Sequence, residues 1–150
     1  MDIMEKMEIR NDQYWLRLQD TELSLMDAEQ FVHHNSCGAV LSFSGMTRDT
    51  FEDKKVIQLS YECYVPMAMK EMERIAKYLI NKYSTLRITI HHRLGVVNVG
   101  ETSVVISVAT PHRAACYEAS RYAIDKLKEQ VPIFKKEIYE GGSTWKANQP

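Results

Sequence analysis

The stretch LRITIHHRLGVVNVGETSVVISVA, residues 86–109, decides the fold class. Its first part, 86–92, alternates apolar and polar residues with the period of a half-buried strand. A second apolar run, 103–109, has the length of a strand and follows a loop bracketed by Gly95 and Gly100. Two strands joined by such a short connection pair in antiparallel fashion. This part of the sequence therefore predicts a hairpin in a mainly antiparallel sheet.

Three helices are predicted around this hairpin from apolar spacing and end signals. They run from about Leu25 to His34, from Pro66 through Tyr83, and from His112 to about Gln130. Ser24 with Asp27 resembles a capping box at the first helix, and Pro66 suits the first turn of the second. Pro132 ends the third helix, because the residue before a proline disfavours helical backbone.

The other predicted strands are short apolar or alternating runs. They lie at residues 14–18, 38–45, 56–63 and 133–139. Residues 46–55 are polar and lack helical spacing, which indicates an exposed loop, so the runs 38–45 and 56–63 are expected to pair as a second hairpin. The order βαββαββαβ predicts an α+β fold, with about three helices packed on a mainly antiparallel sheet.

Length and composition agree with a single domain. The chain has 150 residues and no internal repeat, low-complexity tract or Pro/Gly-rich linker. We expect a single domain over 1–150, with a flexible N-terminus at 1–11 and a C-terminal tail at 141–150. With 45% hydrophobic and 26% charged residues, the composition is typical of a globular protein.

Charge and hydropathy constrain the partners and the compartment. A net charge of −1 gives no support to nucleic-acid binding. No apolar run approaches the roughly 18–20 residues that span a bilayer, and Met1–Arg10 lacks the apolar core of a signal peptide. We therefore expect no membrane association and a cytoplasmic location. Residues 38–110 and 111–150 carry +2 each, against −5 for 1–37, which suits a small anionic ligand.

The three cysteines, Cys37, Cys63 and Cys116, are far apart in the sequence. No C-x-x-C pair exists, so neither a zinc site nor a thioredoxin-type redox pair is indicated. Free cysteine behaves as a small buried hydrophobe. We expect all three to be reduced packing residues, and we expect no metal and no cofactor.

Five basic side chains stand where they could bind an anion. They are Arg48 after a strand, His112 and Arg113 at a helix start, Lys128 in a last helical turn and Lys135 on the final strand. A helix N-terminus favours anions, and an arginine there adds a bidentate donor. Structural explanations compete: Arg48 as a solvated loop charge, His112 as a cap, Lys128 as a partner of the helix dipole. A charged strand edge would explain Lys135. These residues alone predict an anion-binding α+β domain of unknown function.

Several ordered blocks together resemble the large, catalytic subunit of molybdopterin synthase, the MoaE family. The blocks are Gly38-Ala39 through Arg48, His92-Arg93-Leu94-Gly95 with Val99-Gly100-Glu101, His112-Arg113 with Glu118-Ala119, Leu127-Lys128 with Pro132 to Glu137, and Trp145. The resemblance covers about residues 12–147 with the intervals intact, and Pro111 departs from it where an alanine often stands.

The resemblance implies a sulfurtransferase of molybdenum cofactor biosynthesis. Its substrate would be cyclic pyranopterin monophosphate (precursor Z), converted to the dithiolene of molybdopterin. Its sulfur donor would be the C-terminal Gly-Gly thiocarboxylate of a small ubiquitin-like subunit, whose tail enters a pocket of the large subunit. Two large subunits would form a homodimer at the centre of a two-plus-two heterotetramer.

The same resemblance assigns roles to residues of this chain. Substrate binding is implied for Met46, Thr47, Arg48, His112, Arg113, Lys128, Lys135, Lys136 and Glu137. Lys128 and Lys135 are also implied to be catalytic, with Phe43 and Ile124 as pocket walls. Lysines that are partly buried among other cations have lowered pKa values, which makes them usable as acid or base near neutral pH. Which of the two lysines donates and which accepts a proton stays open.

Two other functions remain compatible with the residues. A non-catalytic module that binds a phosphorylated metabolite needs Arg48 and Arg113 but gives Lys128 and Lys135 no task. A docking scaffold for a ubiquitin-like protein needs a groove for the tail but no phosphate site. Formation of a dithiolene product distinguishes the enzyme from both.

Overall fold

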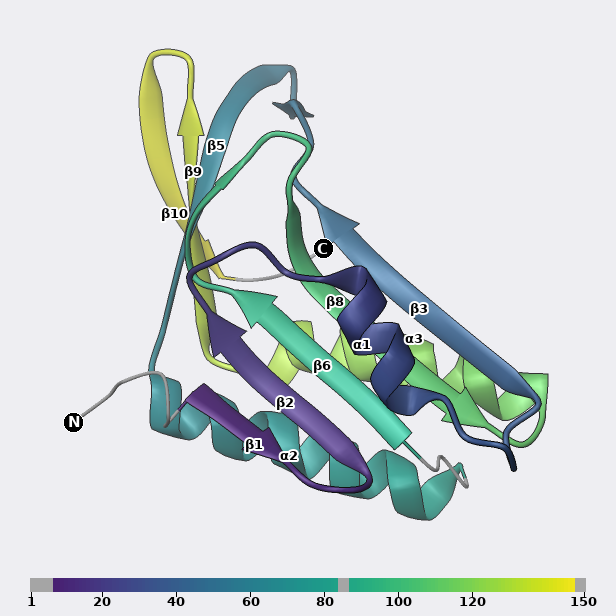
Figure 1. Ribbon diagram of the computed structural model, residues 1–150. Coiled ribbons are helices and arrows are strands. Elements are labelled where there is room, and N and C mark those ends of the chain that lie inside the picture. Colours follow the sequence, from purple (N-terminus) through teal and green to yellow (C-terminus); the bar gives the residue numbers. More distant parts are fainter. Residues whose placement is uncertain (1–6, 84–86, 148–150) are drawn as a thin grey trace.

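The computed structural model describes residues 7–83 and 87–147, which form three helices and ten strands (Figure 1). The helices are α1 (Leu25–Val32), α2 (Val65–Lys82) and α3 (Arg113–Gln130). The strands are β1 (Glu8–Arg10), β2 (Tyr14–Gln19), β3 (Ala39–Met46), β4 (Thr50–Phe51), β5 (Lys54–Cys63), β6 (Arg87–Arg93), β7 (Gly95–Asn98), β8 (Thr102–Thr110), β9 (Ile133–Tyr139) and β10 (Gly142–Ala147).

The larger sheet has the strand order β1-β2-β6-β8-β3 and carries the core on one face. All its pairs are antiparallel except β2 with β6, which run parallel. Helices α2 and α3 cover one face and α1 the other (Figure 1). Strand β6 shows why: Ile88 and Ile90 are fully buried toward the long helices, whereas Thr89 donates its hydroxyl to the Ala28 carbonyl of α1 at 2.9 Å.

The long helices bury the apolar stripes that their sequence contains. In α2, Met69, Met72, Ala76 and Leu79 are buried at spacings of three and four residues. In α3 the stripe is Cys116, Ala119, Ala123 and Leu127. The short α1 begins as the sequence predicted, since the Ser24 side chain accepts from the Asp27 amide at 3.1 Å.

A smaller sheet stands at one end of the larger one. Its order is β10-β9-β5-β4, and β7 pairs with part of β5 on the β4 side. Strand β5 leads into α2, and β9 follows α3. The smaller sheet therefore lies next to the start of α2 and the end of α3 (Figure 1). The end of α3 is thereby placed beside strands of both sheets.

The predicted α+β class and the hairpin of 86–109 are confirmed, with Ile90 opposite Ile106 in β6 and β8. Leu86 lies outside the described residues. The predicted pairing of 38–45 with 56–63 is wrong, because β3 pairs with β8 and β5 pairs with β9 and β7. The connection after Thr47 forms its own short strand, β4, and carries the chain from one sheet into the other.

Four segments expected to be irregular contain strands. Part of the predicted flexible N-terminus, 1–11, is β1, and part of the predicted tail, 141–150, is β10. Residues 1–6 and 148–150 lie outside the described part of the chain. The predicted loops 46–55 and 95–100 hold β4 and β7. Such short strands lack a periodic signal and form because a neighbouring strand offers backbone partners.

The helices within the described residues are too short or too polar to cross a membrane.

Candidate functional site

A narrow cavity of about 160 Å³ lies where the two sheets and the end of α3 meet. Its walls come from β3, β4, β5, β8, α3 and β9. They are formed by Phe43, Gly45, Met46, Arg48, Thr50, Phe51, Val56, Leu59, Tyr61, Ser103, Val104, Lys128, Lys135 and Glu137. Three of these side chains are cations and one is a carboxylate, so the cavity has an excess of positive charge.

Lys128 and Lys135 are the half-buried cations of this cavity. Burial lowers the pKa of Lys128, and the nearby charge of Lys135 lowers it further. Burial also lowers the pKa of Lys135, with contributions from Lys146 and Arg48, although Glu137 opposes them. Because each ammonium group disfavours the other, one lysine loses its proton more readily than an ordinary surface lysine. A shift in this direction is what acid–base catalysis by a lysine requires.

Glu137 is the buried carboxylate of the site, with 3% of its surface exposed. It accepts a hydrogen bond from the Tyr139 hydroxyl at 3.0 Å and pairs with the Lys146 ammonium at 2.6 Å. Burial alone would raise the pKa of Glu137, but the bonds from Lys146 and Tyr139 and the lysine charges outweigh it and lower that pKa. Glu137 therefore stays ionised and offsets part of the positive charge around Lys135.

The end of β3 forms one wall of the cavity. The register with β8 shifts between Gly45 and Met46, and a Cβ at Gly45 would come within 2.6 Å of Val104 Cγ1. Glycine thus lets β3 approach β8 closely at this point. Beyond it Met46 is 60% exposed and Arg48 is exposed, both lining the cavity. Thr47 is buried and donates its amide to the Glu101 carbonyl at 3.1 Å, which holds the turn in place.

His112 and Arg113 are not brought to this cavity within one chain. They lie exposed at the start of α3, where the His112 carbonyl accepts from the Thr110 hydroxyl at 2.7 Å. Lys128 is 15 residues further along the helix, which is about 22 Å at 1.5 Å per residue. The predicted substrate-binding set is therefore divided between the two ends of α3.

Two further predicted residues also lie off the cavity. Lys136 points to the opposite side of β9 from Lys135, with its ammonium 5.6 Å from the ring centroid of Trp145. Ile124, one turn before Lys128, packs half-buried against the core. Phe43 lines the cavity as expected.

The sequence interpretation missed Tyr61 and Ser103 in the cavity wall, and also Lys146, which lies outside the wall and pairs with Glu137. Tyr61 is buried on β5 directly opposite Lys135, and its ring packs edge-on against His92 with centroids 4.9 Å apart. Burial raises the pKa of Tyr61 and lowers that of His92 to about 4, so both stay uncharged beneath the lysines. The run 56–63 was predicted to be a strand with a buried face. Because it was assigned the wrong partner strand, the sequence did not show that Tyr61 lies opposite Lys135.

Metal ligation has no obvious site in the part of the chain that the structure describes. Within it, His, Cys, Asp and Glu side chains do not gather in groups of three or more that could hold a metal ion.

Comparison with known proteins finds relatives that match over most of the chain. The family model described as "MoaE protein" matches residues 18–130. The chain is 50% identical over 128 residues to a molybdopterin synthase catalytic subunit of Homo sapiens, covering 85% of this chain and 68% of that protein. It is 48% identical over 139 residues to the one of Culex quinquefasciatus, covering 90% and 88%.

A solved structure of molybdopterin synthase from Staphylococcus aureus matches with a TM-score of 0.82 and 36% identity, covering 86% of this chain and 94% of that one. A molybdopterin cofactor biosynthesis protein E from Burkholderia multivorans matches with a TM-score of 0.76 at 24% identity, which supports the fold alone.

Proposed function

We propose a function from one premise: this chain belongs to the MoaE protein family. It is the catalytic subunit of a molybdopterin synthase, a sulfur-transferring enzyme. The observation that carries the proposal is the pair Lys128 and Lys135, half-buried in one cavity with lowered pKa values. Neither a phosphate-binding module nor a docking scaffold needs lysines that lose protons easily.

The reaction that fits this pair transfers sulfur to cyclic pyranopterin monophosphate. The thiocarboxylate sulfur attacks a carbon of the pterin side chain, so that a C–S bond forms, a C–O bond breaks and the departing oxygen takes up a proton. Water then hydrolyses the resulting thioester, which leaves the sulfur on the pterin and a carboxylate on the partner's tail. A protonated lysine can supply that proton, and its neutral neighbour can accept one. The positive charge of the cavity also attracts the anionic thiocarboxylate. In this proposal Lys128 and Lys135 are the catalytic residues and Arg48 contacts the substrate.

The size of the cavity supports entry of the partner's tail. At about 160 Å³ it is smaller than the roughly 300–1,000 Å³ of pockets that enclose whole small molecules. An extended Gly-Gly terminus has no side chains and fits such a narrow space. This space suits the C-terminal Gly-Gly thiocarboxylate of a small ubiquitin-like subunit, the sulfur donor that the family resemblance implies. The pterin phosphate then needs additional surface beside the cavity.

A second copy of the chain supplies that surface in our proposal. Strand β3 is an edge of the larger sheet and exposes Phe43 and Met46. When the same edge of two copies pairs about a two-fold axis, the strands run antiparallel, so the start of one lies beside the end of the other. The start of β3 pairs with Thr110, which leads into His112 and Arg113. These two residues would thus reach the Met46 end of the partner's β3, where the cavity lies.

The compartment follows from the cysteines. Cys37, Cys63 and Cys116 are all free thiols in the structure. A chain with unpaired cysteines suits a reducing environment, so we place the enzyme in the cytoplasm.

The test is a product assay with the purified chain. Cyclic pyranopterin monophosphate and a thiocarboxylated small subunit are added, and the dithiolene product is followed. We expect product with the thiocarboxylate and none with the plain carboxylate. Binding of both ligands without product would instead support one of the two non-catalytic functions.

The shared site has its own test by mixing variants. Neither Lys128→Ala nor Arg113→Ala alone makes product efficiently, but a mixed dimer contains one site with both residues intact. Random mixing makes half of the dimers mixed, so about a quarter of wild-type activity should return. Light scattering and mass spectrometry verify that the subunits have exchanged. If they have exchanged and activity does not return, the result would contradict a shared site.

A further inference from the structure

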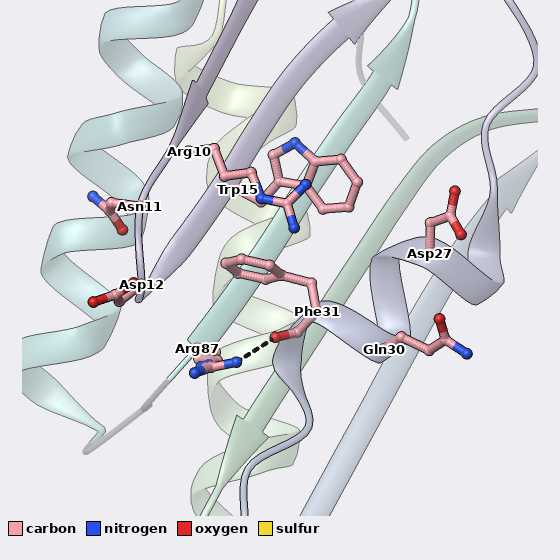
Figure 2. A pocket seen from close by; sticks show the side chains of 8 residues that line it. All are labelled: Arg10, Asn11, Asp12, Trp15, Asp27, Gln30, Phe31 and Arg87. Carbon is pink, nitrogen blue, oxygen red and sulfur yellow. Dashed lines mark hydrogen bonds between the residues drawn. The ribbon is translucent and has the colours of Figure 1, made fainter.

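A second, larger cavity (Figure 2) lies where β1 turns into β2 and β6 begins, at the end of the larger sheet that is remote from the smaller sheet (Figure 1). It has a volume of about 620 Å³ and opens between the β1–β2 turn, the C-terminal part of α1 and the start of β6. Its walls include Arg10, Trp15, Phe31 and Arg87. None of these residues lines the sulfur-transfer cavity. The proposed function gives this second cavity no task.

Two guanidinium groups lie around one aromatic ring here. The Arg10 guanidinium carbon is 4.1 Å from the Trp15 ring centroid and 5.2 Å from that of Phe31. The Arg87 guanidinium carbon is 5.7 Å from the Phe31 centroid, and its Nη1 donates to the Phe31 carbonyl at 3.0 Å. Figure 2 shows the Phe31 ring between the two arginines. The guanidinium carbons are thus no more than about 11 Å apart.

Both arginines lack a carboxylate partner in the described chain. Within residues 7–83 and 87–147, the ion pairs include neither Arg10 nor Arg87. This holds although Asp12 and Asp27 line the same cavity. A guanidinium fork that is not paired with a carboxylate keeps N–H groups available for a bidentate anion such as phosphate.

The aromatic stacking favours a ligand that also carries a planar ring. Trp15 is buried and supports one face of the Arg10 guanidinium, so the opposite face is a flat platform toward the cavity. Nucleic-acid bases stack on such guanidinium planes as they do on aromatic side chains. Asp27, at the rim on α1, provides an acceptor for N–H groups of a base. A volume of about 620 Å³ lies within the usual range of small-molecule pockets.

We propose that this cavity binds a nucleoside monophosphate, with the base on the Arg10 plane and the phosphate held by Arg87. The ribose then passes over Phe31, the ring that separates the two arginines. The proposal does not depend on the sulfur-transfer reaction, because the site is at the other end of the sheet and uses different residues.

The test follows Trp15 fluorescence during titration with adenosine 5′-monophosphate, using the full chain with Trp145→Phe so that one tryptophan remains. Inorganic phosphate and adenosine are titrated in parallel, since each offers one half of the ligand. We expect saturable quenching by the nucleotide at sub-millimolar concentration, at least tenfold tighter than by either half. Arg10→Ala and Arg87→Ala should each weaken it at least tenfold. Arg121→Ala, which removes an exposed arginine on α3, is the matched control.

Three results of these titrations would contradict the proposal or a part of it. If the nucleotide shows no saturable binding up to about 10 mM, the proposal would be overturned, because a specific site binds at least this tightly. Nucleotide binding no tighter than that of inorganic phosphate would overturn the stacking of the base. Equal affinity in the wild-type chain and in Arg10→Ala, a substitution at an exposed position, would also overturn it.

Discussion

The two cavities differ in the surroundings of their cations, since the first contains half-buried lysines beside the exposed Arg48 and the second is lined by arginines that lie over aromatic rings. The sulfur-transfer cavity holds Lys128 and Lys135, half-buried in a narrow space that disfavours their charged forms. The remote cavity holds Arg10 and Arg87, stacked on aromatic rings in an open space. A lysine can be driven to lose its proton by burial, whereas a guanidinium stays charged under all physiological conditions. Burial thus equips one cavity for proton transfer, and stacking equips the other for binding.

Replacing the proton-transferring lysine tests most directly whether the first cavity carries out proton transfer. Lys128→Ala should reduce product formation by roughly 10²–10⁴-fold, the usual contribution of general acid–base catalysis. Lys128→Arg should fail almost as badly, because it restores charge but cannot release a proton. Lys135→Ala should also be severe. Single-turnover assays of dithiolene formation measure the losses.

The control for these variants is Lys126→Ala, two residues earlier on α3, where the ammonium pairs with Glu129 at 3.0 Å on the surface. It should retain wild-type activity. The small subunit should still bind to Lys128→Ala. Turnover by Lys128→Ala at the wild-type rate would contradict the proposed mechanism.

A second prediction concerns binding by the arginines of the sulfur-transfer site. Arg113→Ala and Arg48→Ala should each weaken binding of the pterin phosphate by roughly ten- to a hundredfold, the effect of one charged hydrogen-bond donor of about 1.5–3 kcal/mol. Binding of the small subunit should change much less. Calorimetry with each ligand measures both affinities. Equal losses for the two ligands would mean that the arginines are structural.

A third, smaller effect is the dependence of stability on pH. The pKa of Lys128 is lowered in the folded protein. Between that lowered value and the usual lysine pKa of about 10.4, the unfolded chain binds more protons than the folded one. The contribution of Lys128 to the free energy of unfolding therefore rises with pH across this window. Lys128→Met should remove the rise, measured as the difference between variant and wild type in urea unfolding from pH 7 to pH 10.

Lys126→Met is the matched variant for that measurement. Its lysine pairs with Glu129, which raises its pKa, so its contribution cannot rise with pH in the same window. If the pH-dependent rise in the free energy of unfolding persisted in Lys128→Met and vanished in Lys126→Met, it could not be assigned to Lys128.

The smallest expected effect is that of the cysteines, which should be none. Cys116 is 2% exposed, and burial raises the pKa of its thiol; burial also raises that of Cys63, to about 11, and that of Cys37. Raised pKa values disfavour the nucleophilic thiolate. A folded Cys37→Ser, Cys63→Ser, Cys116→Ala variant should make product from the thiocarboxylated partner at the wild-type rate. A persulfide trapped on Cys116 during turnover, detected by mass spectrometry, would overturn the donor assignment.

Local signals in the sequence predicted the helices well. Ser24 caps α1, Pro66 lies in the first turn of α2, and the helix that ends before Pro132 is α3. Each signal acts within a few residues, so it needs no knowledge of the tertiary structure. The burial expected for Cys116 is confirmed for the same reason, since helical spacing fixes which face it occupies.

Strand partners could not be predicted in the same way. Nothing within 38–63 indicates that β3 and β5 belong to different sheets. The choice depends on β8 and β9, each of which lies more than 50 residues after the strand that it pairs with. The error extended to the site. Lys128 and Lys135 were found through their motif, whereas Tyr61 and Lys146 required knowledge of which strands flank β9.

The parallel pair of β2 and β6 also affects how the chain is made. Tyr14 pairs with Ile88, so more than 70 residues are synthesised after Tyr14 before its partner residue appears. At about 5–20 residues per second this takes about 4–14 s. During that interval Leu16 and Leu18, both fully buried in the finished protein, have only the three-residue β1 as a neighbouring strand. The nascent N-terminal segment therefore exposes these apolar side chains until β6 has been made.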